Sequence, residues 1–193
     1  MESLRILIAD DESIRLLSLR AQLAALGHIV VAEASNGEEA VVLAASTQPD
    51  LAIIDIRMPV ADGIEAAQRI TEARPIPIIL LTAYSEAQLV ERAAQANIAA
   101  YLMKPVSEED LLPAITLALI RFRQFQALRR EVADLREALE ARKLIERAKG
   151  ILMRRTACSE PDAYRILQRS SQDRSKPMVE IARAVLDSEP GAG

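Results

Sequence analysis

Residues 51–59 read LAIIDIRMP, an apolar run that ends in a single carboxylate and is then interrupted by a proline. Pro49-Asp50 precedes the run, so residues that disfavour strands bound it on both sides. A short apolar run of this kind predicts a strand that is buried on both faces of a parallel sheet. Asp55 would lie at the carboxyl end of that strand, where open α/β sheets place their binding sites. Taken alone, Asp55 has a plainer interpretation as a helix cap or a turn residue.

The rest of the first 120 residues alternates apolar runs with segments of helical spacing. Five strands alternating with five helices predict a parallel sheet with right-handed crossovers. The strands are expected at residues 4–9, 29–32, 51–55, 77–82 and 99–103. The helices are expected from 13 to Gly27, from Asn36-Gly37 to about 45, from Asp62-Gly63 to about 70, from about 86 to 96, and from an N-cap at Ser107.

Polar residues stand where four of these strands end. Asp10 and Asp11 follow the first strand, Asp55 ends the third, Thr82 ends the fourth and Lys104 follows the fifth. In a doubly wound sheet these ends share one edge, so the five side chains are predicted to meet in one cleft. Three neighbouring carboxylates repel one another, and a hard divalent cation such as Mg²⁺ compensates for that repulsion. Separately, the Asp10-Asp11 pair would be read as a helix cap and Lys104-Pro105 as a surface turn.

The chemistry that this cleft predicts is capture of a phosphoryl group on Asp55. A carboxylate is a nucleophile towards phosphorus, a metal neutralises the charge of the reacting oxygens, and a lysine with a hydroxyl can hold the phosphoryl oxygens. The sequence contains neither a Walker A motif nor the protein-kinase motif set. The phosphoryl group is therefore expected to come from a partner protein or a small donor.

Residues 4 to about 120 resemble the receiver domain of two-component response regulators. The resemblance also covers Met58-Pro59 and Asp62-Gly63 after the third strand, and Lys104 with its cis-prolyl neighbour Pro105. It implies a flavodoxin-like fold with a doubly wound five-stranded parallel sheet. It implies a sensor histidine kinase as partner, Asp55 as phospho-acceptor, and a switch through Thr82 and Tyr101. It also implies Mg²⁺ bound by Asp11, Asp55 and the backbone carbonyl of Arg57, with Asp10 contributing through water.

Charge divides the chain into two parts. Residues 1–120 contain eight Lys or Arg against 17 Asp or Glu, whereas residues 121–193 contain 16 against 11. An acidic front half and a basic back half indicate separate tasks. We expect a receiver domain at 1–120, a coiled-coil helical linker at 121–140 and a small three-helix domain at 141–190. A basic helical surface has the plainer explanation of an ordinary solvated face.

The linker is expected to continue the last receiver helix as a coiled-coil segment. Its apolar residues are spaced by three and four and are flanked by charges: Phe125, Leu128, Val132, Leu135 and Leu139. Such a seam must be covered, either by a second copy of the chain on activation or by the chain's own domain. We favour a homodimer.

Residues 141–190 resemble the ANTAR domain, the RNA-binding output of transcription antitermination regulators. The resemblance rests on Arg142, Ile145, the run AKGILM at 148–153, Ala163-Tyr164, Leu167, Asp173-Arg174 and Ile181-Ala182. Ser170-Ser171-Gln172 departs from the Ala-Ala-Met usual in the family. The full chain is similar to the mycobacterial regulators that join these two modules. Their function would be phosphorylation-controlled binding of RNA hairpins, in tandem, to promote antitermination.

The residues expected to contact RNA are mostly basic. They are Arg147, Lys149, Gly150, Arg154, Arg155, Arg165 and Arg169, and Tyr164 is either a stacking surface for a loop base or a core aromatic, which we favour. The alternative outputs are DNA binding or protein interaction, although no convincing helix-turn-helix is found in 139–187.

The remaining features exclude other classes of protein. The back half has no catalytic constellation, so we do not expect an enzyme. A single cysteine, Cys158, fits a reducing compartment, and neither a membrane span nor a signal peptide is recognised, so we expect a cytoplasmic protein. His28, the only histidine, is expected at the surface of a strand edge.

Overall fold

The structure is a computed structural model and describes residues 3–83 and 98–188. The chain divides into two units, Met1–Gln126 and Ala127–Gly193, with the division inside one long helix. Within the described residues, no helix is both long enough and apolar enough to cross a membrane.

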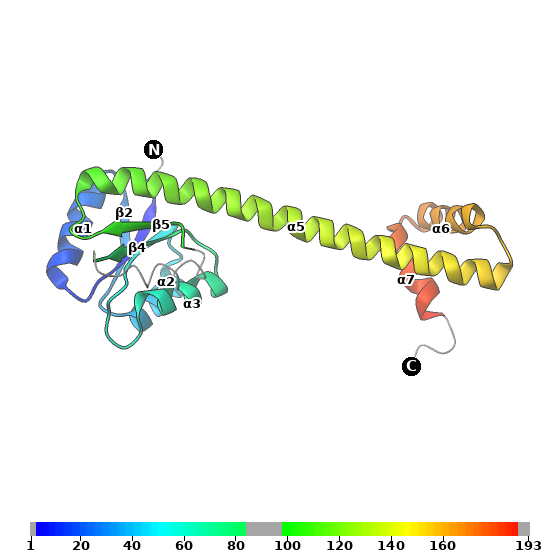
Figure 1. Ribbon diagram of the computed structural model, residues 1–193, viewed down its shortest axis with the longest axis horizontal. Coiled ribbons are helices and arrows are strands. Elements are labelled where there is room, and N and C mark those ends of the chain that lie inside the picture. Colours follow the sequence, from blue (N-terminus) through cyan, green and yellow to red (C-terminus); the bar gives the residue numbers. More distant parts are fainter. Residues whose placement is uncertain (1–2, 84–97, 189–193) are drawn as a thin grey trace. The chain divides into compact units, whose positions relative to one another are not determined.

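The first unit is built on a five-stranded parallel sheet (Figure 1). Its strands are β1 (Arg5–Ala9), β2 (Ile29–Ala34), β3 (Leu51–Asp55), β4 (Ile78–Thr82) and β5 (Ala100–Met103), in the order β2-β1-β3-β4-β5. The helices described in this unit are α1 (Ser13–Ala25), α2 (Gly37–Thr47), α3 (Gly63–Ala73) and the first part of α5 (Glu108–Thr156). The predicted flavodoxin-like fold is confirmed. The helix predicted at 86–96 lies outside the described residues.

Alternation along β3 builds a core on each face of the sheet. Ala52 and Ile54 pack with residues of α2 and α3, whereas Leu51 and Ile53 pack with residues of α1 and α5. All five residues of β3 are buried, because helices cover both faces and β1 and β4 pair with its two edges. The acidic end of this strand is therefore held in a rigid frame.

Local signals define the helix starts as predicted. The side chain of Asn36 caps α2 by accepting from the Glu39 amide, and that of Asp62 caps α3 by accepting from the Glu65 amide. At the start of α5, the Asp110 carboxylate accepts hydrogen bonds from both the amide and the hydroxyl of Ser107.

His28 contradicts the expectation of a surface position. Its side chain is only 5 % exposed, and its Nδ1 accepts a hydrogen bond from the Leu4 amide at 3.3 Å. The α1–β2 turn that carries His28 packs against the start of β1, so the imidazole is covered.

The second unit contains the rest of α5, followed by α6 (Glu160–Arg174) and α7 (Met178–Asp187). Ser159 caps α6, and Pro161 lies in its first turn, as the sequence predicted. The three helices enclose a small core in which Ala148, Leu167, Ile181 and Ala182 are buried and pack together, and Ile151 and Ala163 are also buried in this unit.

Candidate functional site

The carboxyl ends of four parallel strands bring the predicted polar residues to one edge of the sheet. Asp10 follows β1, Asp55 ends β3, Thr82 ends β4 and Lys104 follows β5. The Lys104–Pro105 peptide bond is cis, as the receiver resemblance implied. Parallel register explains this meeting point, because each strand delivers its last side chain to the same side of the unit.

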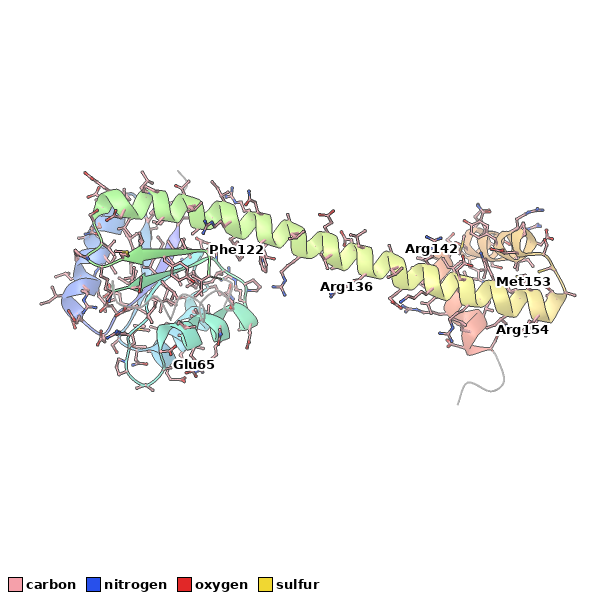
Figure 2. All side chains as sticks on the ribbon, in the orientation of Figure 1. Glu65, Phe122, Arg136, Arg142, Met153 and Arg154 are labelled. Carbon is pink, nitrogen blue, oxygen red and sulfur yellow. The ribbon has the colours of Figure 1, made fainter. Side chains whose placement is uncertain are left out.

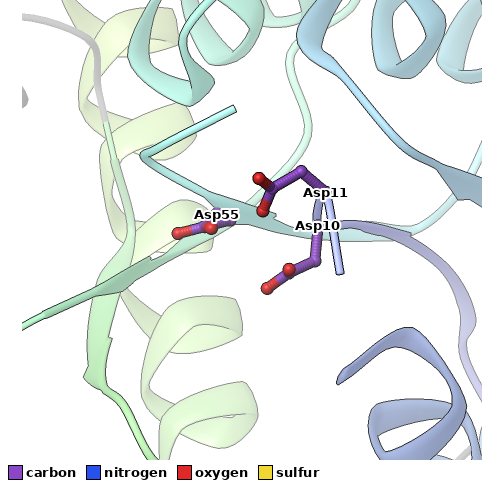
Figure 3. A group of neighbouring side chains, drawn as sticks. All are labelled: Asp10, Asp11 and Asp55. Carbon is purple, nitrogen blue, oxygen red and sulfur yellow. The ribbon is translucent and has the colours of Figure 1, made fainter. Parts of the chain in front are cut away.

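Three carboxylates form the centre of this site (Figure 3). One carboxylate oxygen from each of Asp10, Asp11 and Asp55 lies within 4.8 Å of the other two. Asp10 and Asp55 are buried, whereas Asp11 is exposed. Hard oxygen donors at this spacing, with one side open to solvent, fit the ligand preference of Mg²⁺.

A cavity of about 270 Å³ opens beside the carboxylates. Its lining comprises Asp11, Glu12, Arg15, Asp55, Arg57, Ala83 and Lys104. The backbone N–H of Arg57 donates to the Asp55 carboxylate. Arg57 thus reaches the site through its backbone, and the cavity leaves room for a small anionic group next to Asp55.

Lys104 joins two of the carboxylates. Its Nζ lies 2.6 Å from Asp55 Oδ2 and 3.0 Å from Asp10 Oδ2. Burial raises the pKa of the Asp55 carboxyl above its usual 3.8, while the hydrogen bond from Lys104 acts in the opposite direction. Lys104 therefore offsets part of the cost of keeping an ionised carboxylate buried at Asp55.

Arg15 is a site residue that the sequence reasoning missed. Its Nη1 lies 3.0 Å from Asp10 Oδ1 and 3.4 Å from Asp55 Oδ2, and its Nη2 pairs with Glu12. Leu16, Leu19 and Leu23 bury one face of α1 against the sheet. The helical phase set by these leucines turns Arg15 towards the acidic edge, and tracing that phase from Asp11 onward could have found it.

The two predicted switch residues lie on neighbouring strands. Thr82 is buried at the end of β4, and Tyr101 is half-buried against the core that faces α2 and α3. Burial raises the pKa of the Tyr101 hydroxyl. Residues 84–97, between β4 and β5, lie outside the described residues.

The raised pKa of Asp55 predicts a pH-dependent stability. The folded receiver binds this proton more tightly than the unfolded chain does, so stability is lost as pH rises from about 3.8 through the raised pKa. Asp55→Asn removes the ionisation, and we expect it to raise the thermal midpoint in metal-free buffer at pH 7, by an amount that shrinks as pH falls towards 4. Thermal denaturation from pH 4 to 8 measures this, with exposed Asp187→Asn in the second unit as control. A constant difference across that range would contradict the assignment.

In the second unit, most of the predicted RNA-contacting residues are at the surface. Arg147, Arg154, Arg155, Arg165 and Arg169 are exposed, and Figure 2 shows Arg154 and the neighbouring Met153 on the last turns of α5. Arg155 donates to Ser188 Oγ at 2.9 Å, and Arg165 pairs with Asp162 at 3.5 Å. The exposed guanidinium groups of α5 and α6 can reach a polyanion without unfolding the small core.

Lys149 and Gly150 have different surroundings from these arginines. Lys149 is buried, and its Nζ lies 2.9 Å from Glu146 and 2.7 Å from Glu160, which ties α5 to the start of α6. The pKa of Lys149 is raised by its hydrogen bond to Glu160 and, next, by that to Glu146. A methyl group at Gly150 would come no closer than 3.8 Å to Arg154 Nη1. Lys149 is thus engaged within the unit, and nothing near Gly150 in the described residues requires a glycine.

Tyr164 contradicts our preference for a core position. It is 44 % exposed, because Ala163 and Leu167 are the residues of α6 that face the core. Its ring is accessible on the same helix as Arg165 and Arg169, where a base could stack on it.

The seam predicted on α5 is exposed along its length. Phe125, Leu128, Val132, Leu135 and Leu139 are between 38 % and 64 % exposed. Large apolar side chains repeating on one face of a charged helix are typical of a surface that another helix covers.

Comparison with known proteins adds two family matches. Residues 6–116 match the response regulator receiver domain, and residues 133–186 match the ANTAR domain. The second match begins inside the segment predicted as linker. Over 184 residues, the chain is 49 % identical to the transcriptional regulatory protein PdtaR of Mycobacterium tuberculosis, an alignment that covers 95 % of this chain and 90 % of PdtaR.

Solved receiver structures match the first unit. A signal receiver domain of a modulated diguanylate cyclase from Desulfovibrio desulfuricans has a TM-score of 0.60 at 34 % identity, covering 64 % of this chain and 98 % of that one. CheY in a CheX–CheY–BeF₃–Mg²⁺ complex from Borrelia burgdorferi has a TM-score of 0.55 at 26 % identity, covering 57 % and 85 %.

Proposed function

Because the chain belongs to the two-component response regulators and joins a receiver domain to an ANTAR domain, we propose that phosphorylation of Asp55 by a sensor histidine kinase controls RNA binding by the second unit. The observation that carries this proposal is the convergence of Asp10, Asp11 and Lys104 on the buried carboxylate of Asp55. Proteins of this family are regulators, so the proposed response to phosphorylation is a change in RNA binding.

In the proposed transfer, an oxygen of Asp55 attacks the phosphorus of a phosphohistidine on the kinase. The new P–O bond forms as the P–N bond breaks, and the histidine nitrogen recovers a proton from solvent. Lys104, whose Nζ lies 2.6 Å from Asp55 Oδ2, would pair with a phosphoryl oxygen. Mg²⁺ held by Asp10, Asp11, Asp55 and the Arg57 carbonyl would supply positive charge to the phosphoryl oxygens. Thr82 would hold another oxygen, and Tyr101 would follow its movement.

The proposed output is capture of RNA hairpins, with transcription antitermination as the result. Exposed arginines on α5 and α6 supply phosphate and base-edge contacts, and Tyr164 supplies a stacking surface. Lys149 would act through its ion pairs, by fixing the start of α6 against α5, and Gly150 would allow RNA to approach the helix closely.

Dimerisation would couple phosphorylation of the receiver to RNA binding by the second unit. The exposed seam from Phe125 to Leu139 is suited to a coiled coil between two copies, and phosphorylation would favour that pairing. A dimer carries two RNA-binding units, so RNA with two hairpins in tandem would be bound by avidity.

The test is a gel shift with tandem-hairpin RNA and the full chain, with and without phosphorylation. Because the second hairpin then binds intramolecularly, we expect phosphorylation to lower the Kd by about 100-fold on tandem RNA and only slightly on a single hairpin. Asp55→Asn should abolish this change. An unaltered Kd on phosphorylation would refute the switch.

Two further arms separate the parts of the proposal. Leu128→Ala with Leu135→Ala should keep single-hairpin binding and lose the avidity, whereas Arg130→Ala with Glu137→Ala changes exposed residues outside the seam and should keep it. If duplex DNA competes with the labelled hairpin as strongly as unlabelled hairpin RNA does, the output of the second unit is DNA binding and not RNA binding.

A further inference from the structure

Arg15 pairs with two of the three carboxylates that a metal ion would need. Its Nη1 donates to both oxygens of Asp10, at 3.0 and 3.1 Å, and to Asp55 Oδ2 at 3.4 Å. Two of the three carboxylates that could hold a cation are therefore already paired with a guanidinium that belongs to the chain itself.

A bound metal would compete with this pairing for the same carboxylates. Asp10, Asp11 and Asp55 carry three negative charges, which Lys104 and Arg15 offset with two positive ones. A divalent cation on Asp10 and Asp55 would come up against carboxylates that Arg15 already pairs with, and two cations on the same oxygens repel each other. Lys104 follows β5 and makes its shorter contact with Asp55. We therefore expect Arg15, and not Lys104, to leave the carboxylates when a metal binds.

We propose that Arg15 is a built-in competitor of Mg²⁺: its guanidinium neutralises Asp10 and Asp55 in the metal-free receiver and has to leave them before the metal can bind. This inference rests on the metal site of the proposed function. It adds that the magnesium affinity of the receiver, and so its readiness for phosphorylation, is set by a residue of α1.

Two features of the surroundings would allow the Arg15 side chain to move away from Asp10 and Asp55. Its Nη2 already pairs with exposed Glu12, which can keep the guanidinium when Asp10 and Asp55 are released. Arg15 also lines a second cavity of about 440 Å³, which reaches from Asp10 and Lys104 to Ser18 and Gln22 of α1, and its far end leaves space for the displaced side chain. The backbone of α1 need not move, since Leu16 and Leu19 anchor it to the sheet.

The consequence is an apparent Mg²⁺ affinity reduced by the fraction of molecules in which Arg15 is displaced. An ion pair that is partly exposed changes a coupled equilibrium by several-fold, so we expect Arg15→Gln and Arg15→Met to lower the Kd for Mg²⁺ by about fivefold to tenfold. The Met variant keeps an unbranched apolar stem and therefore guards against loss of packing along α1.

Isothermal titration calorimetry of the full chain with MgCl₂ measures these constants. Arg20→Gln is the matched control, because Arg20 is on the same helix but pairs with Glu33 at 2.9 Å, away from the site, and its Kd should equal that of the wild type. A Kd in both Arg15 variants that equals or exceeds the wild-type value would overturn the proposal and leave the proposed function intact. Failure of every form to bind Mg²⁺ would overturn both.

A second measurement needs no substitution. In the wild type, the Nε–H resonance of Arg15 should shift during a Mg²⁺ titration and saturate at the calorimetric Kd, while that of Arg20 stays constant. An Arg15 resonance that does not respond to saturating Mg²⁺ would also overturn the proposal.

Discussion

Gly63→Ala is expected to destabilise the receiver unit by about 3 kcal/mol, the upper end of the usual cost of overpacking, since the backbone has to move to make room. A methyl group at Gly63 would overlap the carbonyl oxygen of Asp55 and lie 2.8 Å from its carbonyl carbon. The helix cannot retreat easily, because the Gly63 amide donates to the Ile56 carbonyl at 2.9 Å. The strand cannot retreat either, because β3 is paired on both edges.

The same substitution should also slow the proposed phosphorylation, since the carbonyl oxygen that the new methyl group would overlap belongs to Asp55, the proposed phospho-acceptor. Thermal or urea denaturation of the full chain would show the first transition lowered, and any folded fraction should accept phosphate more slowly. Gly150→Ala is a matched control in another helix: its methyl group meets only Arg154 Nη1 at 3.8 Å, so it should raise stability by about 0.5–1 kcal/mol. Equal stability of the two variants would show that α3 can shift without cost.

Much of this fold and site could be predicted because the signals are local. The apolar run that ends at Asp55 is short, buried along its whole length and bounded by prolines, and such a run has few other structures available to it. The side-chain caps at Asn36 and Asp62 fix two helix starts within a residue. Once five parallel strands were inferred, topology alone brought Asp10, Asp55 and Lys104 to one edge.

The errors and omissions arose where exposure depends on a distant neighbour. Arg15 reaches the carboxylates only because three leucines fix the rotation of α1. Lys149 is buried where the start of α6 brings Glu160 against it. In the sequence, it could not be distinguished from an exposed lysine that is available to RNA. His28 and Tyr164 were assigned to the wrong environments for the same reason: the first lies under the start of β1, and the second is one residue away from the face of α6 that packs.

Leu167→Ala is expected to unfold the small three-helix core while leaving the receiver folded. Leu167 is fully buried in that core, where it packs with Ile181 and with partly buried apolar residues of α5 and α7. Truncating a buried leucine costs about 2–5 kcal/mol. A core supporting fewer than 70 residues supplies only about 3–5 kcal/mol in total, so little stability would remain.

The expected signature is selective. The far-UV circular dichroism of the full chain should lose the helical signal of α6 and α7. Hairpin binding should weaken by more than about 100-fold, because an unfolded interface has to fold before it can bind. Phosphorylation of Asp55 should proceed at the wild-type rate. Ile166→Ala is the matched control, since it removes a similar side chain that is 40 % exposed on the same helix and should change stability by no more than about 0.5 kcal/mol. Hairpin binding that survives Leu167→Ala would mean that the RNA contacts lie on α5 alone, whereas loss of phosphorylation in the same variant would mean that the two units do not fold independently.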